Sequence, residues 1–109
     1  MADTSHEDVS RDELKRGLAD GSIALVDVRE PNEWADGHIP GAVLNPLQSF
    51  DPAALPPLQE GRRIVLHCRS GKRSLVALDR AHAAGRTDIK AHYAGGMLDW
   101  NGAGEPIEE

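Results

Sequence analysis

The sequence predicts an α/β fold in which a parallel β-sheet is covered by helices on both faces. Segments typical of strands alternate along the chain with segments typical of helices, as they do in parallel sheets. The two clearest strand candidates, residues 23–26 and 64–67, are short and mostly apolar, which indicates burial on both faces. With 109 residues, of which 39% are hydrophobic, the chain is expected to form one domain over 1–109 with an ordered core over about 7–107.

The first half of the chain is expected to supply two helices and two strands. Ser10 and Glu13 match a capping box, in which each residue satisfies a free backbone N–H of the other. Pro31 is favourable at the first position of a short helix, because its missing N–H would be unpaired there anyway. In order, we expect a helix over 11–19, a strand over 23–26, a helix over 31–35 and a strand over 42–44.

The second half begins with a proline-rich segment, residues 45–62, which is expected to form a loop with one or two short helical turns. After it, residues 64–67 form a mostly apolar run, and apolar residues recur at helical spacing over 74–84. Over 89–93 apolar residues occupy alternate positions. These patterns predict a strand over 64–67, a helix over 74–84, a weaker strand over 89–93 and a short helix over 97–100. The tail from Gly102 onward is expected to be partly frayed.

The charge and composition exclude several classes of protein. The net charge of −6 argues against a surface that binds nucleic acid or anionic membranes, and no apolar run reaches transmembrane length. A single cysteine allows no internal disulfide, which fits a reducing compartment. The polar, acidic N-terminal segment lacks the basic and apolar regions of a signal peptide, so we expect a cytoplasmic protein.

The only cysteine, Cys68, stands between the third expected strand and the helix that follows it. Parallel sheets bind ligands at the carboxyl ends of their strands, and helix N-termini offer N–H groups and a positive dipole. Gly71 permits a left-handed turn, while Arg69, Lys72 and Arg73 add positive charge. All of these features favour a thiolate. The sequence therefore predicts that Cys68 is ionised and that an anion binds beside it.

The alternative is that Cys68 is a small buried hydrophobic residue and that the cations belong to a solvated loop. Two observations weigh against this alternative. The sequence becomes polar immediately after Cys68. Cations at a helix N-terminus also oppose the helix dipole at a cost of about 0.3–1 kcal/mol each, which a bound anion would offset.

Three segments resemble the signatures of the rhodanese domain family. They are LVDVREPNEWADGHIPGAVLNP (25–46), CRSGKRS (68–74) and YAGGMLDWNGAGEPI (93–107), and together they cover nearly the whole chain in the right order. The resemblance implies a single-domain α/β sulfurtransferase. In that family the loop cysteine takes the outer sulfur of a donor such as thiosulfate, holds it as a persulfide, and passes it to cyanide or a thiol.

Carried onto this chain, the resemblance implies that Cys68 is the nucleophile and persulfide carrier. The implied partners are a small anionic sulfur donor and a cyanide or thiol acceptor, with a thioredoxin-like protein as one candidate. No metal or organic cofactor is required. Asp27 and Arg29 are candidates for a supporting role, and fixing the turn after their strand is the favoured one. The implied substrate-binding residues are Arg69, Ser70, Gly71, Lys72, Arg73 and Ser74.

Two other functions remain open at this point. His67 and Cys68 resemble the start of the tyrosine phosphatase loop, so a phosphatase or arsenate-reducing enzyme is one alternative. That loop has five residues between cysteine and arginine, whereas only four separate Cys68 from Arg73. The second alternative is a non-catalytic rhodanese-like binding module, although such modules often lack the cysteine.

A metal site is not expected. His6, His82 and His92 show no ligand spacing with the cysteine or with carboxylates.

Overall fold

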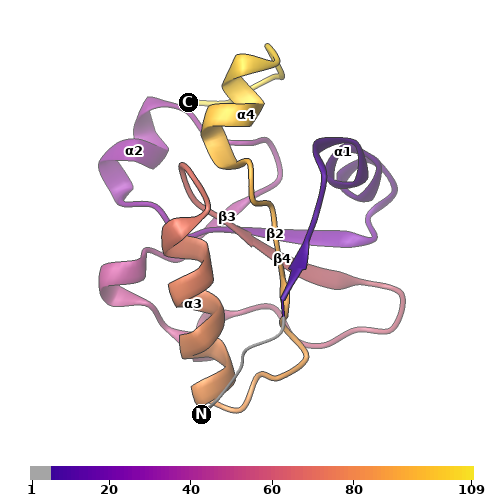
Figure 1. Cartoon of the computed structure of the whole chain (residues 1–109), viewed down its shortest axis with the longest axis vertical. Coiled ribbons are helices and arrows are strands. Elements are labelled where there is room, and N and C mark those ends of the chain that lie inside the picture. The colour runs from indigo at the N-terminus through magenta and orange to yellow at the C-terminus, as the bar shows by residue number, and fades with distance from the viewer. Residues whose placement is uncertain (1–5) are drawn as a thin grey trace.

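The computed structural model describes residues 6–109, which fold into one five-stranded parallel sheet with helices on both of its faces (Figure 1). The strands are β1 (Glu7–Asp8), β2 (Ile23–Asp27), β3 (Val43–Leu44), β4 (Arg63–His67) and β5 (Ala91–His92), in the spatial order β1-β5-β4-β2-β3. The helices are α1 (Arg11–Asp20), α2 (Pro31–Asp36), α3 (Lys72–Ala83) and α4 (Gly96–Gly102), and two 3₁₀ turns are η1 (Leu47–Ser49) and η2 (Pro52–Ala54). The predicted fold class is confirmed.

The side chains of the sheet divide between two buried clusters because successive residues of a strand point to opposite faces. Ile64 and Leu66 of β4 pack in the cluster that contains the buried apolar residues of α3. Val65, between them, packs in the other cluster with Leu14 of α1 and Trp100 of α4. In Figure 1, α3 and α1 accordingly lie on opposite sides of the sheet. By the same alternation Cys68 belongs to the α3 side, where it is part of that cluster.

The N-terminal strand β1 was not predicted from the sequence. Its pairing with β5 rests on backbone hydrogen bonds, such as that from the Val9 N–H to the His92 carbonyl at 2.9 Å, and places Asp8 opposite His92. Glu7 and Asp8 themselves are exposed and charged, so no hydrophobic pattern marks the strand. The strand expected over 89–93 is likewise shorter than predicted.

The C-terminal tail, which was expected to be partly frayed, is attached to the rest of the domain. His38 and Glu108 form an antiparallel bridge through two backbone hydrogen bonds of 2.8 Å. The indole N–H of Trp100 donates to the Pro106 carbonyl at 2.8 Å. These contacts could not be predicted from the tail alone, because their partners, His38 and Trp100, lie outside it.

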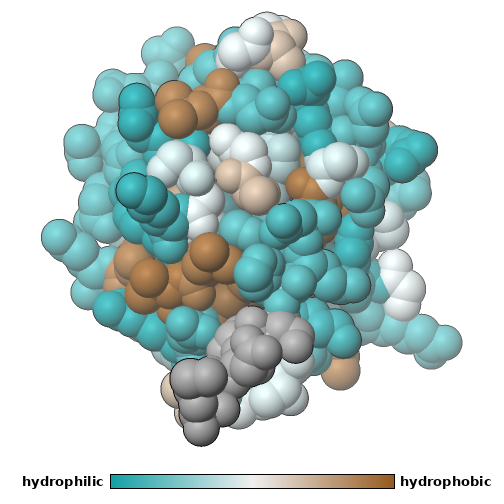
Figure 2. Space-filling view, viewed as in Figure 1, coloured by the Kyte–Doolittle hydropathy of each residue, from teal (hydrophilic) through white to brown (hydrophobic). Residues whose placement is uncertain are grey.

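The face shown in Figure 2 is mostly hydrophilic and carries only separate hydrophobic patches. Leu75 and Val76 on α3 and Leu98 on α4 are among the apolar side chains that remain exposed. Within residues 6–109, every helix is too short or too polar to cross a membrane.

Candidate active site

Cys68 follows β4 directly and begins a tight loop that ends where α3 starts at Lys72. Gly71 adopts a left-handed conformation with φ of 91° and donates its N–H to the sulfur of Cys68 at 3.1 Å. A β-carbon at Gly71 would lie 2.7 Å from the carbonyl oxygen of Ala94, so a side chain is excluded there as well as strained. The loop therefore closes over the sulfur, and Cys68 is only 1% exposed.

The N-terminus of α4 holds the other side of this loop. The N–H groups of Met97 and Leu98 donate to the carbonyl oxygens of Cys68 and Arg69, at 3.0 and 3.1 Å. Because the C=O and N–H of one peptide point in opposite directions, this turns the N–H of Ser70 away from α4 and toward the cysteine sulfur, whose pKa it helps to lower. The two helices together thus fix the direction of the loop amides.

Hydrogen bonds make Cys68 more acidic than an ordinary thiol. Burial by itself raises the pKa of Cys68, but hydrogen bonds from Ser74, Ser70 and Gly71 outweigh it, and the net pKa is lowered. Because these donors account for the shift, the loop cations contribute less to ionisation than the sequence analysis assumed. The thiolate of Cys68 is therefore stabilised mainly by N–H and O–H groups that point at its sulfur.

The lowered pKa of Cys68 has a direct test. The rate of alkylation by iodoacetamide should rise with pH through a midpoint below the free-cysteine value of about 8.5, because the thiolate is the reacting form. The absolute rate is expected to be slow, since the sulfur is nearly buried. A midpoint at or above that of free cysteine would contradict the assignment of the loop groups as thiolate donors.

The three cations of the loop differ in whether they are paired within the protein or free to contact an incoming anion. Arg73 donates to both carboxylate oxygens of Glu33 in α2, at 2.6 and 2.9 Å. This pairing is the main reason that the pKa of Glu33 is lowered to about 2. Arg69 and Lys72 are exposed, and neither forms an ion pair within the part of the chain that the structure describes. Arg69 and Lys72 are therefore the cations available to an incoming anion.

Asp27 and Arg29 form a buried pair below the loop. The guanidinium of Arg29 donates to the Asp27 carboxylate at 2.8–3.0 Å and to the Gly37 carbonyl at 2.8 Å. Neither side chain is hydrogen-bonded to the Cys68 loop. Their position fits the turn-fixing role that the sequence analysis favoured, in which they connect the end of β2 to α2.

His67, which precedes the cysteine, faces the opposite side of the sheet. Its Nδ1 lies 3.2 Å from the Cys68 carbonyl oxygen, and its Nε2 lies 3.6 Å from the carboxylate of Asp27. Burial lowers the pKa of His67, so the ring is neutral. His67 contributes to the support beneath the loop and does not reach the cysteine sulfur.

Ser74 connects the loop to residues that the sequence analysis did not select. Its hydroxyl oxygen lies 3.7 Å from the Cys68 sulfur and 2.8 Å from Nδ1 of His92. Nε2 of His92 is in turn 3.0 Å from the Asp8 carboxylate. The only local sign of a role for His92 was its position in a strand with its side chain facing inward. Its contact with Ser74 depends on the pairing of β5 with β4, which the local sequence does not reveal.

His6 and His92, whose spacing indicated no metal-ligand set, lie together with Asp8 at this edge. One nitrogen or oxygen atom from each lies within 4.8 Å of the others, which makes them the described side chains that come nearest to a metal-ligand set. The hydrogen bond between His92 and Asp8 accounts for this arrangement, and we assign no ion to it.

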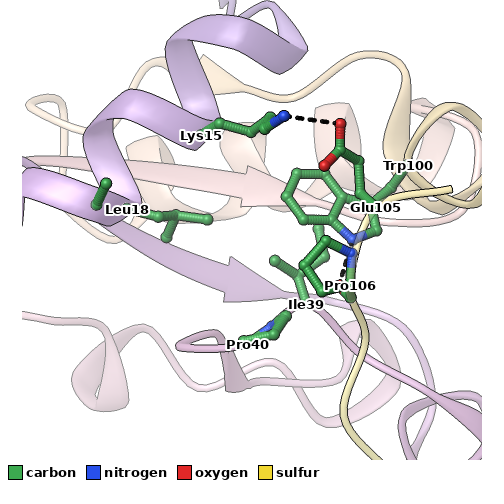
Figure 3. Close-up of a pocket in the computed structure, with 8 residues that line it drawn as sticks. Lys15, Leu18, Ile39, Pro40, Trp100, Glu105 and Pro106 are labelled. Atoms are coloured by element: carbon green, nitrogen blue, oxygen red, sulfur yellow. Dashed lines mark hydrogen bonds and ion pairs between the residues drawn. The ribbon is translucent and has the colours of Figure 1, made fainter. Parts of the chain in front are cut away.

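A surface hollow of about 280 Å³ lies elsewhere, between α1 and the C-terminal tail (Figure 3). Lys15 and Glu105 form an ion pair of 2.9 Å at its rim, and Ile39 and Trp100 contribute apolar walls. None of its lining residues belongs to the Cys68 loop. The reactive chemistry therefore lies in the Cys68 loop, away from this hollow.

Comparison with known proteins shows which proteins the chain is similar to. A family model described as the rhodanese-like domain matches residues 10–103. The human thiosulfate:glutathione sulfurtransferase is 36% identical over 105 residues, which cover 84% of this chain and 90% of the human protein. The solved structure of a human single-domain sulfurtransferase superposes with a TM-score of 0.72 at 33% identity, covering 93% of this chain and 97% of that one.

Other relatives are longer proteins. A probable adenylyltransferase/sulfurtransferase, MoeZ, from Mycobacterium tuberculosis is 40% identical over 90 residues, which cover 81% of this chain but only 23% of the relative. The chain spans less than half the length of several of the curated relatives it matches.

Proposed function

The chain belongs to the rhodanese-like domain family, and we propose that it is a sulfurtransferase that carries sulfur as a persulfide on Cys68. The proposed donor is thiosulfate or a similar sulfur-bearing anion, and the proposed acceptor is a thiol or cyanide. The single observation that carries the proposal is the direction of the loop amides, since Gly71 donates to the cysteine sulfur at 3.1 Å from the start of α3.

The proposed reaction has two displacement steps. The Cys68 thiolate attacks the outer sulfur of thiosulfate, a new S–S bond forms, and sulfite leaves with the electrons of the broken bond. The acceptor thiolate or cyanide then attacks the terminal sulfur, and Cys68 leaves as a thiolate. The N–H groups that stabilise the thiolate can also stabilise the anionic terminal sulfur of the persulfide.

Detection of the persulfide tests the proposal. The protein is incubated with thiosulfate, the excess donor is removed, and mass spectrometry of the peptide that contains Cys68 measures the gain of one sulfur atom. Addition of glutathione or cyanide should return the peptide to its original mass. Protein alkylated at Cys68 beforehand serves as the control. If Cys68 never carries the added sulfur, the proposal fails.

The exposed loop cations should assist the binding of an anionic donor. Replacing both Arg69 and Lys72 by glutamine is expected to raise KM for thiosulfate by about 3–10-fold, because local charge attracts the dianion to an otherwise acidic protein. The matched control replaces Arg16 and Arg62, exposed cations at other parts of the surface, and should leave KM nearly unchanged. An equal effect on an uncharged persulfide donor would show instead that the two loop cations act on the cysteine.

The structure gives a reason to expect no phosphatase activity. The loop holds one residue fewer than the phosphatase pattern, and the guanidinium of Arg73 is engaged by Glu33. A phosphoryl group needs donors for three equatorial oxygens in the transition state. We expect hydrolysis of p-nitrophenyl phosphate near its uncatalysed rate and little inhibition of sulfur transfer by vanadate. Phosphatase turnover comparable to sulfur transfer would favour the alternative function.

A further inference from the structure

A chain of polar contacts runs from the cysteine sulfur to the molecular surface. It passes from Cys68 to Ser74 at 3.7 Å, from Ser74 to Nδ1 of His92 at 2.8 Å, and from Nε2 of His92 to the Asp8 carboxylate at 3.0 Å. The exposed fractions of Cys68, Ser74 and His92 are 1%, 0% and 2%. Only Asp8, at the far end, is exposed. The two displacement steps make no use of His92 or Asp8.

The sheet register explains why these residues meet. Leu66 of β4 pairs with His92 of β5, and Cys68 lies two residues beyond Leu66 on the same face. On the other side of β5, Asp8 of β1 is the register partner of His92. Ser74 reaches the same place from the first turn of α3. Three segments that are distant in sequence, residues 68–74, β5 and β1, thus supply one continuous hydrogen-bonded path.

The hydrogen-bond roles along the path follow from the acceptor at its end. An ionised carboxylate only accepts, so Nε2 of His92 carries a hydrogen and donates it to Asp8. In the neutral ring Nδ1 is then an acceptor, and at 2.8 Å it lies closer to the Ser74 oxygen than the Gly71 carbonyl, the other acceptor, at 3.2 Å. We therefore assign the hydroxyl hydrogen of Ser74 to Nδ1. The lone pairs of Ser74 are therefore free to accept from the S–H of Cys68.

We propose that Ser74, His92 and Asp8 form a relay that receives the proton of Cys68. The S–H proton passes to the Ser74 oxygen as the Ser74 proton passes to Nδ1 of His92. The number of protons is unchanged, and the products are a thiolate and an imidazolium. The Ser74 hydroxyl then donates to the thiolate, and Asp8 offsets the positive charge of the ring. His92 is a positioning residue in this scheme, since it acts through Ser74.

The surroundings of His92 suit this role. The titratable groups that face it are Asp8 and His6 on the β1 side and Cys68 on the α3 side. Burial lowers the pKa of His92, and the neighbouring carboxylate of Asp8 only partly opposes that effect. The ring is therefore neutral while Cys68 is a thiol, which leaves Nδ1 open to a proton. The other residues of α3 buried against the sheet, apart from Ser74, are apolar.

Alkylation of Cys68 tests the relay without any sulfur transfer, so that its failure and the failure of the proposed function are distinguishable. The proposal rests on the proposed function only in taking Cys68 as the nucleophile. His92→Asn keeps a polar group near Ser74 but cannot accept a proton. We expect iodoacetamide alkylation at pH 7 to slow about tenfold, with the pH midpoint about one unit higher. At high pH, where Cys68 ionises without help, the rates of variant and wild type should converge.

Further variants separate the relay from a structural role. Ser74→Ala should raise the midpoint similarly, and adding His92→Asn to it should cause no further shift, because the path is already broken. His6→Gln is the matched control, since His6 is near Asp8 but lies outside the path, and it should leave the profile unchanged. A chelator is present throughout to exclude bridging metal ions.

If His92→Asn does not fold, Asp8→Asn provides the test at an exposed position. It retains an acceptor for Nε2 but removes the charge, so we expect a smaller upward shift of the same midpoint. An unchanged midpoint in the folded variants, or a loss of rate that is equal at every pH, would overturn the relay.

Discussion

Replacing Cys68 by serine is expected to reduce sulfur transfer by at least about 10³-fold, because no other thiol in the chain can carry a persulfide. A serine hydroxyl is far less acidic than a thiol and does not form a stable bond with a transferred sulfur. The loop N–H groups would still bind the serine oxygen, but they would no longer stabilise an anion. Sulfite release from thiosulfate, with cyanide or glutathione as acceptor, measures the loss.

The same variant should remain folded. Serine is slightly smaller than cysteine and can accept the hydrogen bond from Gly71, so we expect a stability change of only about 1 kcal/mol. Urea unfolding of both proteins measures that change. Ser70→Ala, an exposed position in the same loop whose backbone N–H is retained, is the matched control and should keep most of its activity. Turnover above about a hundredth of wild type in the folded cysteine variant would show that sulfur transfer does not pass through Cys68.

The elements that could be predicted from the sequence are those with a local signal. The capping box at Ser10 and Glu13 is formed by both of its hydrogen bonds, of 3.1 and 3.3 Å. One or two short helical turns were expected within residues 45–62, and the structure has two, η1 and η2. Cys68 stands at the end of its strand, as a change from apolar to polar residues indicated. In each case neighbouring residues carry the information, so a single sequence suffices.

The interactions that were missed join residues far apart in the chain. Arg73 was taken as a contact for the donor, but its charge is directed to Glu33, forty positions earlier. His92 was considered only as a metal ligand, because its contact with Ser74 requires the register of β5 against β4. β1 was missed because strand pairing through the backbone leaves no mark on side chains. Tertiary contacts thus decide which of the predicted loop residues is free and which is engaged.

The electrostatics of the site also combine features that are visible in the local sequence with features that depend on tertiary contacts. The cations near Cys68 are visible in the sequence, but the groups that lower its pKa are the backbone N–H and hydroxyl of Ser74 and the backbone N–H groups of Ser70 and Gly71. The direction of an amide depends on what holds its carbonyl, and here that is the start of α4, about thirty residues away in the chain. Gly95 and Gly96, at the start of α4, therefore affect the chemistry of Cys68 through the backbone contacts between α4 and the loop.

Replacing Gly96 by alanine is expected to damage the active site although the residue carries no functional group. Gly96 is buried with φ of 59°, and a β-carbon there would lie 2.5 Å from the carbonyl oxygens of both Cys68 and Arg69. These are backbone atoms, so the clash can be relieved only by moving the loop or α4. We expect a loss of about 2–4 kcal/mol in unfolding free energy from overpacking and strain.

The effect on Cys68 should exceed what lost stability alone would cause. Displacing the loop weakens the hydrogen bonds from Met97 and Leu98 to its carbonyls, so the amides no longer point at the sulfur. In the folded fraction of Gly96→Ala, alkylation of Cys68 should show a higher pH midpoint, and sulfur transfer should fall about 100-fold. Gly102→Ala, in the same helix but with open space around its β-carbon, is the matched control and should change neither quantity. Wild-type reactivity in folded Gly96→Ala would mean that the loop amides keep their direction without α4, because contacts within the loop and α3 are enough to set it.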